Sequence, residues 1–352
     1  MTTETRGDSL MLADLARTLL HASGALGLYH RWRNARTLTV VGFHRVLDPA
    51  DPRWASCDPD YTLPTTLLAQ SLAFFRRHYN VVSLAQVVDA SRGVAALPPR
   101  ALLVTFDDGW ADNAEFALPA LREAGVPAAM FVVADAVGRH QPFFQEQLVS
   151  AWRRGTVTVA ELARMLDAHG GGEGDPPARE ESLPALRAVI ARMEDLEPAA
   201  RACLLAPLAG RLDDGRRHMV DVEELERLQQ GGVALGLHGK THIALTRAPD
   251  LEAELSGARD ALAGHLAAAR PPAPAMSFPH GAHDEAVVAR VREAGYALAF
   301  TSVPVLNPAR PTVGWLLGRT GFEGGTVVDA RGRFRPERLA LYLFRRPHQR
   351  LA

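Results

Sequence analysis

The chain has 352 residues, of which 47% are hydrophobic, so it can form one large barrel or two ordinary domains with a buried active site. Its formal net charge of −1 excludes a general attraction to nucleic acid or to an anionic membrane, and we expect no nucleic-acid partner, although local basic patches stay open. Cys57 and Cys203 are its two cysteines, which excludes a disulfide framework and leaves the cell compartment open.

Residues 1–36 are expected to form an N-terminal segment with an amphipathic helix from about residue 9 to 28. This segment lacks the basic leader and the unbroken apolar core of a secretory signal, so we expect a cytoplasmic protein. Asp14, Arg17 and His21 interrupt the apolar stretch, which argues against a spanning helix. The helix either packs on the domain that follows or docks on a membrane surface as a peripheral contact.

From residue 37 onward, short runs rich in β-forming residues alternate with helical patterns. The predicted strands are 37–43, 80–84, 101–106, 127–133, 233–237, 274–278 and 297–301. The helical patterns between them include 63–79, 113–125 and 284–295. This alternation predicts a parallel sheet with crossover helices, open or closed into a barrel, whose chemistry collects at the carboxyl ends of the strands.

Three segments depart from the alternation. Residues 47–61 are rich in Pro and Asp and form either a lid that faces the substrate or a solvated connection. Residues from about 140 to 220 favour helices and indicate a helical insertion that could shape or cover a cleft. Residues 333–350 predict a terminal helix, which is either solvated or in contact with lipid head groups or an acidic partner.

The predicted strand 101–106 leads into the sequence TFDDG. Adjacent carboxylates at a strand end point to different sides of the backbone, so one of Asp107 and Asp108 can reach a metal while the other faces water. Gly109 permits a sharp exit of the chain from the strand. A DDG sequence alone is often only a turn.

His238 and His242 lie four residues apart in LGLHGKTHIAL, after the predicted strand 233–237. Residues with this spacing project the same way on a helical turn, so the two imidazoles can converge on one ion. They are equally compatible with a half-buried surface that binds nothing. A third ligand, preferably a carboxylate, would decide for a metal site.

The predicted strand 274–278 runs into Pro279, His280 and Gly281. A rigid residue followed by a permissive one makes a turn whose backbone N–H groups could face a developing oxyanion. Without the other motifs this is an ordinary turn.

In this order, TFDDGWADNAEFALPALREAGVPAAMFVV, the H-x-x-x-H pair and SFPHGAHDE resemble polysaccharide deacetylases with the NodB homology domain, carbohydrate esterase family 4. The resemblance covers residues 37–320 and implies a distorted (β/α) barrel, with the helical insertion inside it and residues 321–352 as a C-terminal extension. It implies an enzyme that removes N-acetyl groups from an N-acetylated sugar of a polysaccharide or its lipid-linked precursor. The expected partner is that glycan, and the oligomeric state stays open.

The resemblance also implies roles for the motif residues. Asp107 corresponds to the general base, and Asp108 with His238 and His242 corresponds to a metal triad. Such a donor set suits a divalent ion that activates water, and we expect Zn²⁺.

Two more assignments concern the leaving group and the oxyanion. His280, in the turn from Pro279 to Gly281, corresponds to the residue whose backbone N–H helps to hold the oxyanion. His44, after the first predicted strand, resembles the histidine that some members use as general acid. It could equally be a strand-end histidine that holds a loop.

The sequence departs from the family pattern at two places. Gly239 stands where the family usually has Ser or Thr, and this could loosen the metal-binding loop. Ser277 and Phe278 stand where an Arg commonly orients the base, and Arg319 from a later strand end is a candidate substitute.

Two other functions compete with the deacetylase. One is an amidase or deformylase acting on a small sugar-derived amide, which a closed pocket would favour over an open groove. The other is a glycan-binding module that has lost turnover, motivated by Gly239 and the missing Arg. The lack of a G-x-S-x-G elbow and of a dinucleotide glycine fingerprint argues against a serine hydrolase and a dinucleotide enzyme.

Overall fold

The computed structural model describes residues 16–169, 180–267, 270–322 and 324–351. Its main sheet runs in the order β10-β1-β5-β6-β7-β8-β9-β11, with β4 beside β5 and β12 beside β1, and all pairings are parallel except β10 with β1. The strands are β1 Thr37–Phe43, β4 Asn80–Val81, β5 Ala101–Asp108, β6 Ala128–Val132, β7 Val233–Leu237, β8 Ala275–Ser277, β9 Leu298–Thr301, β10 Asn307–Pro308, β11 Leu316–Gly318 and β12 Thr320–Gly321. Each predicted strand region contains one of them.

A single stretch of chain closes this sheet. β11 pairs in parallel with β9 at one edge, and β12 pairs in parallel with β1 at the other edge. Only Arg319 separates these two short strands, so the chain passes from one edge of the sheet to the other within a few residues. The sheet is therefore a nearly closed, distorted barrel, which confirms the expected fold class.

The strands are apolar on both faces because both faces are covered. β5 is buried along its whole length: Leu103 contributes to the cluster inside the barrel, and Val104 to the cluster under the surrounding helices. Phe131 and Phe300 lie across the interior with their ring centroids 5.0 Å apart. The barrel is thus a packed core, and its polar groups are confined to the ends of the strands.

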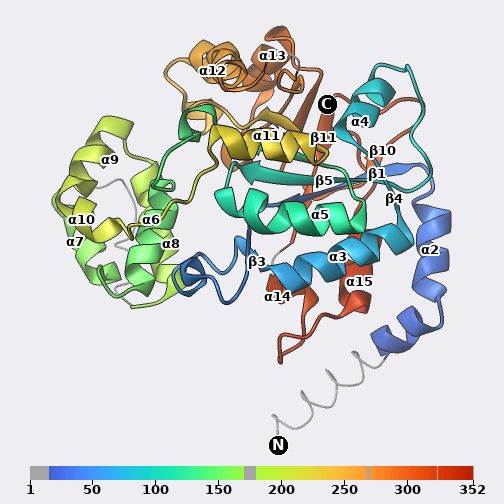
Figure 1. Ribbon diagram of the computed structural model, residues 1–352, viewed down its shortest axis with the longest axis horizontal. Coiled ribbons are helices and arrows are strands. Elements are labelled where there is room, and N and C mark those ends of the chain that lie inside the picture. Colours follow the sequence, from blue (N-terminus) through green and yellow to red (C-terminus); the bar gives the residue numbers. More distant parts are fainter. Residues whose placement is uncertain (1–15, 170–179, 268–269, 323, 352) are drawn as a thin grey trace, which may run out of the picture.

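Helices cover the outside of the barrel (Figure 1). The prediction of helices within 63–79, 113–125 and 284–295 is confirmed by α3, α5 and α13. Between residue 37 and the C-terminus, and outside the insertion, the α-helices that the structure describes are α3 Thr65–His78, α4 Leu84–Ser91, α5 Leu118–Ala124, α11 Val222–Gln230, α12 Ala258–His265, α13 Glu285–Glu293, α14 Gly324–Val327 and α15 Pro336–Phe344. Their starts follow side-chain caps in several cases, as where Ser83 and Gln86 form a capping box at α4.

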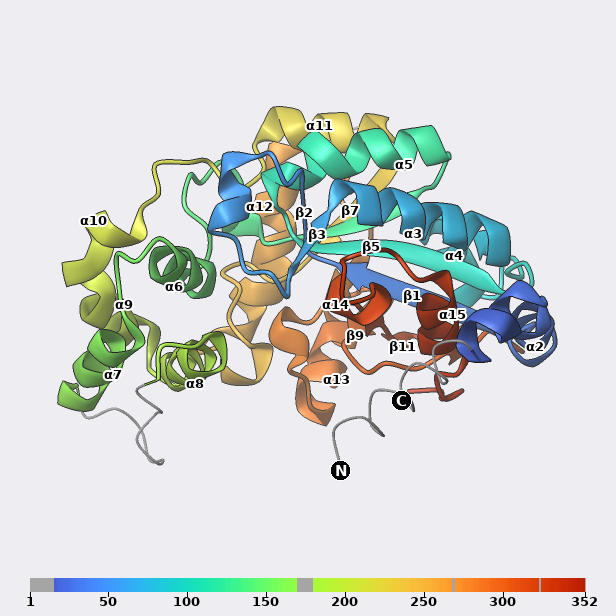
Figure 2. The same cartoon turned by 90° about the horizontal axis from the view of Figure 1, so that it is seen from below.

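The insertion folds around an apolar cluster of its own. Its helices are α6 Phe144–Arg153, α7 Val159–Ala168, α8 Leu183–Glu194, α9 Pro198–Leu205 and α10 Ala209–Leu212. Leu148, Leu162, Leu186 and Leu208 are among the buried residues of this cluster. Figure 2 shows the five helices grouped at one end of the molecule, away from α2 (Ala25–Arg33) at the other end.

The two terminal segments differ from the prediction. Residues 9–15 of the predicted N-terminal helix lie outside the described residues, and the rest is broken: helix 16–22 ends before Gly24, whose φ of 80° is left-handed, and α2 then begins. The C-terminal helix is not simply solvated, because Leu343 and Phe344 of α15 are buried and His30 of α2 stacks on Phe344. Among the described residues, no helix is long and apolar enough to cross a membrane.

Five short strands of the described chain were not predicted from the sequence. β2 Arg45–Leu47 and β3 Thr62–Pro64 pair with each other beside the cleft, and β10, β11 and β12 close the barrel. All five have only two or three residues, too few for an alternation of apolar and polar positions to be visible.

Candidate active site

The two aspartates at the end of β5 point in different directions, as the sequence predicted. Asp107 faces Arg319, whose Nη1 and Nη2 each lie 2.7 Å from one of its carboxylate oxygens. Asp108 faces the histidines, with its Oδ1 3.4 Å from His238 Nε2 and 3.3 Å from His242 Nε2. Asp108 and Gly109 both have positive φ, at 78° and 87°, so the strand ends in the sharp turn that was expected at Gly109.

Asp108, His238 and His242 form a group whose ligand atoms all lie within 4.8 Å of one another. The backbone oxygen of Ser277 lies 2.9 Å from His238 Nδ1, so Nδ1 carries the hydrogen and Nε2 keeps a free lone pair toward Asp108. Burial lowers the pKa of His238 to about 4, which keeps its ring neutral. One carboxylate and two imidazoles fit a divalent ion such as zinc.

His238 and His242 are brought together by a backbone conformation that their spacing did not predict. Instead of sharing a helical turn, the two residues flank a loop in which Gly239 and His242 have positive φ, at 73° and 69°. The carboxylate of Glu254 accepts hydrogen bonds from Lys240 N at 2.7 Å, Thr241 N at 3.1 Å and Thr241 Oγ1 at 2.6 Å. Glu254 therefore anchors the loop between the two histidines.

Position 239 has little room for a side chain. A Cβ there would lie 3.0 Å from Glu254 Oε2 and 3.2 Å from Pro279 Cγ, in a backbone conformation that favours glycine. The brace that a hydroxyl at 239 would supply comes instead from Glu254. Nothing in the sequence around Glu254 signals this role, since it is one of several acidic residues in DLEAEL.

Arg319 binds Asp107 and so takes the position of the arginine that is missing from the motif at Ser277. Its Nη2 also donates to Ser277 Oγ at 2.7 Å, and that hydroxyl lies 3.2 Å from Asp107 Oδ2. Burial alone would raise the pKa of Asp107, but the charge of Arg319 and its hydrogen bonds hold it below the ordinary value. Asp107 is therefore ionised at neutral pH and held by two partners.

The Pro279–Gly281 turn lies against the loop between His238 and His242. Gly281 N donates to Phe278 O at 2.9 Å, whereas the His280 N–H has no hydrogen-bond partner among the described residues. His280 adopts a positive φ of 57°, and its Nε2 lies 2.9 Å from the carbonyl oxygen of His242. The side chain of His280 thus supports the loop, and its N–H is left for a ligand.

His44 lines the same cleft as Asp107 and Asp108. Its ring meets Tyr61 edge-on, with the centroids 5.0 Å apart, and its carbonyl oxygen accepts a hydrogen bond from Asn113 Nδ2 at 2.9 Å. It therefore faces the cleft and also contacts the loop that ends at Tyr61, as its two predicted roles require. The assignment as general acid stays a prediction.

The cleft has a volume of about 790 Å³, and two segments that interrupt the barrel form part of its wall. The loop 47–61 contributes Asp58 and Tyr61, and helix α8 of the insertion contributes Arg187. Arg187 Nη2 lies 2.7 Å from Asp58 Oδ1 and 2.7 Å from Asp60 Oδ2, so the loop and the insertion are joined over the cleft. The loop therefore forms part of the wall of the cleft, and its role as a lid stays a prediction.

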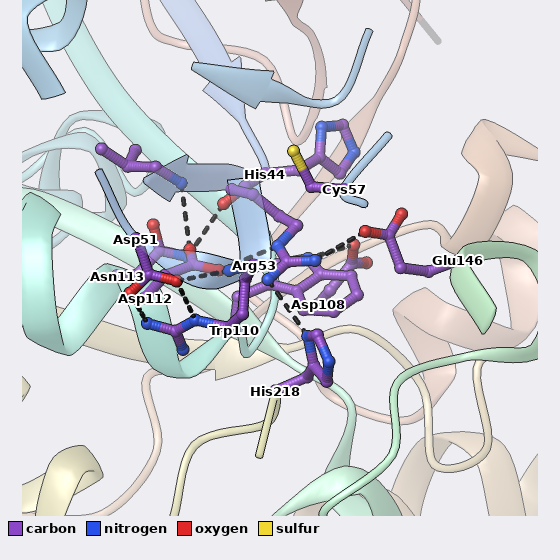
Figure 3. A network of polar contacts seen from close by, with 12 residues as sticks. His44, Asp51, Arg53, Cys57, Asp108, Trp110, Asp112, Asn113, Glu146 and His218 are labelled. Carbon is purple, nitrogen blue, oxygen red and sulfur yellow. Dashed lines mark hydrogen bonds and ion pairs between the residues drawn. The ribbon is translucent and has the colours of Figure 1, made fainter. Parts of the chain in front are cut away.

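A buried network links the barrel to the insertion (Figure 3). Arg45, directly after His44, donates from Nε to Asp112 at 2.8 Å and from Nη1 to Glu146 of α6 at 2.6 Å. Its Nη2 lies 3.2 Å from His218 Nδ1, at the end of the insertion. The side chain of Arg45 is fully buried, so its charge depends on these partners.

The same network reaches the metal triad through Trp110. The guanidinium of Arg45 lies 4.5 Å from the Trp110 ring, and Trp110 Nε1 donates to Asp108 Oδ2 at 2.9 Å. This bond occupies one oxygen of Asp108 and leaves the other facing the histidines. Sequence reasoning missed both residues, although Trp110 directly follows TFDDG and Arg45 directly follows His44.

The chain is similar in sequence to known polysaccharide deacetylases. A family model for polysaccharide deacetylases matches residues 95–170. The chain is similar to a poly-β-1,6-N-acetyl-D-glucosamine N-deacetylase of Escherichia coli (strain K12), with 31% identity over 135 residues. That match covers 36% of this chain and 19% of the other protein, so the alignment spans about a fifth of the length of this curated relative.

Two solved structures resemble the whole barrel. A deacetylase, PplD, of Streptococcus pyogenes, solved with acetate, has a TM-score of 0.54 at 14% identity and covers 87% of this chain and 98% of its own. IcaB of Ammonifex degensii has a TM-score of 0.53 at 19% identity and covers 88% of this chain and 97% of its own. At these identities the likeness is one of fold.

Proposed function

Because the chain belongs to the NodB-type polysaccharide deacetylase family, we propose that it is a metal-dependent hydrolase that removes N-acetyl groups from an N-acetylated sugar. This proposal rests on one observation: two different groups of side chains surround the two aspartates at the end of β5. Asp108 lies against His238 and His242, while Asp107 is held by Arg319 on the other side of the backbone. A metal triad and an oriented base are the groups that hydrolysis of an amide needs.

Each residue then has a defined task. A divalent ion bound by Asp108, His238 and His242 would supply Lewis acidity to the amide carbonyl and the attacking water. Asp107, ionised and fixed by Arg319, accepts the proton of that water. The free N–H of His280 donates to the developing oxyanion, and His44 gives a proton to the departing sugar amine.

The proposed substrate is an N-acetylglucosamine glycan. The cleft is lined by Tyr61, an exposed aromatic side chain on which a sugar ring can pack, and is large enough for more than an isolated amide group. The name of the Escherichia coli relative supports a β-1,6-linked polymer. Retention of Asp107 together with the metal triad speaks against the alternative of an inactive binding module.

The test is release of acetate from β-1,6-linked N-acetylglucosamine oligomers by the zinc-loaded protein. We expect turnover that a chelator removes and zinc restores, and we expect Asp108→Asn to fall to the level of the buffer blank with its bound ion lost. Glu123→Gln, an exposed change away from the cleft, is the matched control. An Asp108→Asn protein with full activity would contradict the metal mechanism, and turnover confined to small N-acyl amides would favour the amidase.

A further inference from the structure

One stretch at the N-terminal end of the described chain exposes most of the large apolar side chains. Of eight such side chains on the described surface, five belong to residues 19–32, namely Leu19, Leu20, Leu28, Tyr29 and Trp32. Soluble surfaces carry exposed apolar residues singly, so a group of this kind marks an interaction site.

Within α2 these side chains share a face. Leu28, Tyr29 and Trp32 are spaced i, i+1 and i+4, while Leu26 and His30 on the opposite face are buried. Leu28 is 66% exposed and Trp32 is 82% exposed. We call Leu28, Tyr29 and Trp32 the α2 surface, and it lies at the edge of the molecule opposite the insertion in both Figure 1 and Figure 2.

The chain around the α2 surface is strongly basic. The segments 25–36, 303–313 and 344–351 meet beside it and contain seven arginines and no acidic residue: Arg31, Arg33, Arg36, Arg310, Arg345, Arg346 and Arg350. Of these, Arg346 lines the catalytic cleft. Within the described part of the chain, none of the seven forms an ion pair. Arg33 and Arg350 donate to backbone carbonyl oxygens instead, which leaves their charge uncompensated.

A hollow next to Trp32 is lined by several of these arginines. It has a volume of about 370 Å³, and its lining includes Trp32, Arg36, Arg310 and His348. Guanidinium groups bind phosphate oxygens through paired hydrogen bonds, and an indole ring prefers the boundary between head groups and acyl chains. The hollow and the α2 surface together therefore offer a phosphate contact beside an apolar one.

We propose that the α2 surface docks on an anionic phospholipid bilayer, with Leu28 and Trp32 at the acyl boundary and Arg36 and Arg310 on lipid phosphates. The apolar side chains need an apolar environment, which a bilayer supplies and a soluble polyanion does not. A second copy of the chain fits poorly, since a symmetric contact would bring two sets of uncompensated arginines together.

The docked orientation places the proposed catalytic residues, though not Arg346 of the cleft wall, at the far end of β1 from the lipid. α2 precedes Thr37, the first residue of β1, whereas His44 and Asp108 lie at the carboxyl ends of the strands. The seven residues of β1 separate these two ends by roughly 23 Å. If the proposed function holds, the docked protein acts on glycan that extends away from the membrane and not on a sugar attached at its surface.

The test is sedimentation of the full chain with phosphatidylcholine vesicles, with and without phosphatidylglycerol. We expect binding that requires phosphatidylglycerol and weakens with salt, and we expect Leu28→Ser/Trp32→Ser and Arg36→Gln/Arg310→Gln each to lower the vesicle partition coefficient about tenfold or more. Val94→Ser is the control, because Val94 is 73% exposed but lies outside this surface.

Three outcomes would overturn the docking proposal. The first is a wild type that does not sediment with anionic vesicles, and the second is equal binding to vesicles of phosphatidylcholine alone. The third is a wild-type dimer that Leu28→Ser/Trp32→Ser dissociates without any vesicle binding, which would make the surface a self-association site. Turnover of soluble oligomers should be unchanged in all three variants, so loss of docking and failure of the proposed enzymatic function are distinguished.

Discussion

At the scale of single residues, the pair of Asp107 and Arg319 shows how a missing motif residue is replaced. The chain has Ser277 where a family arginine was expected, and the structure brings a guanidinium to the same carboxylate from the segment between β11 and β12. Arg319 makes two parallel contacts to Asp107 and a third to Ser277 Oγ. Such a bidentate contact fixes the direction of the carboxylate, which a single ammonium cannot do.

We therefore expect Arg319→Lys to keep the charge and lose the orientation. Turnover should fall about 100-fold, as for a misplaced catalytic group, while bound zinc stays at the wild-type level. Ser277→Ala, which leaves the Arg319–Asp107 pair in place, should have a smaller effect. Steady-state kinetics with metal analysis of the same samples would check this, and loss of zinc in Arg319→Lys would assign the arginine to structure instead.

At the scale of elements, the loop between His238 and His242 depends on a helix that contributes no residue to the proposed metal triad. Glu254 lies in the π-helical turn Ala253–Gly257 before α12 and is buried, and all described hydrogen bonds of its side chain go to the loop between His238 and His242. The position of His242 in space is thus set by packing of that turn against the barrel. Gly239 is compatible with this arrangement because it leaves room for the carboxylate.

Glu254→Gln should weaken zinc binding and leave the fold intact. The amide replaces one carboxylate oxygen by a donor, so it cannot accept from Lys240 N, Thr241 N and Thr241 Oγ1 together, and we expect the zinc dissociation constant to rise about 10- to 100-fold. Competition with a zinc chelator would measure it. Glu252→Gln, with a largely exposed side chain on the same helical turn, should bind zinc like the wild type.

At the scale of the whole molecule, His30 joins the N-terminal helix to the C-terminal one. Its ring stacks on Phe344 with centroids 3.9 Å apart, and its Nδ1 accepts a hydrogen bond from Asn34 Nδ2 at 2.9 Å. The side-chain amide of Asn34 cannot be flipped, because its Oδ1 already accepts hydrogen bonds from Arg33 and His348. Burial, followed by the charge of Arg100, lowers the pKa of His30 to about 3, so the folded protein requires the neutral ring.

This requirement predicts a loss of stability in acid. The unfolded chain binds a proton at His30 near pH 6.5 and the folded chain only near pH 3, so stability is fully present above pH 6.5 and declines as the pH falls. Between pH 6.5 and 5 we expect a loss of about 2 kcal/mol from this group. Urea unfolding at both values would measure it.

The matched variants for this experiment are His30→Phe and His140→Gln. Phenylalanine keeps the stacking on Phe344 but cannot be protonated, so the variant should be less stable at pH 7 and show a smaller acid loss. His140 is exposed, and its variant should keep the wild-type pH dependence. An unchanged acid loss in His30→Phe would place the responsible group elsewhere.

The sequence alone determined the parts of this protein that depend on neighbours in the chain. Alternating strands and helices predicted a parallel sheet, the family resemblance predicted that it closes into a barrel, and the polar residues after the predicted strands placed Asp107, Asp108, the histidine pair and the Pro279 turn at the ends of β5, β7 and β8. These predictions succeed because a strand end and its first loop residues are set by local sequence. The short strands that close the barrel have no such local pattern.

Only the tertiary structure decided which distant side chains complete the site. Arg319 reaches Asp107 across 212 residues of sequence, and Arg45 reaches Glu146 across 101. Glu254 is only 14 residues from Lys240 but contacts it through a loop of left-handed turns. Contacts of this kind arise when the closing barrel and the insertion bring side chains together, and short sequence windows carry no signal of them because the partners share neither a motif nor a spacing.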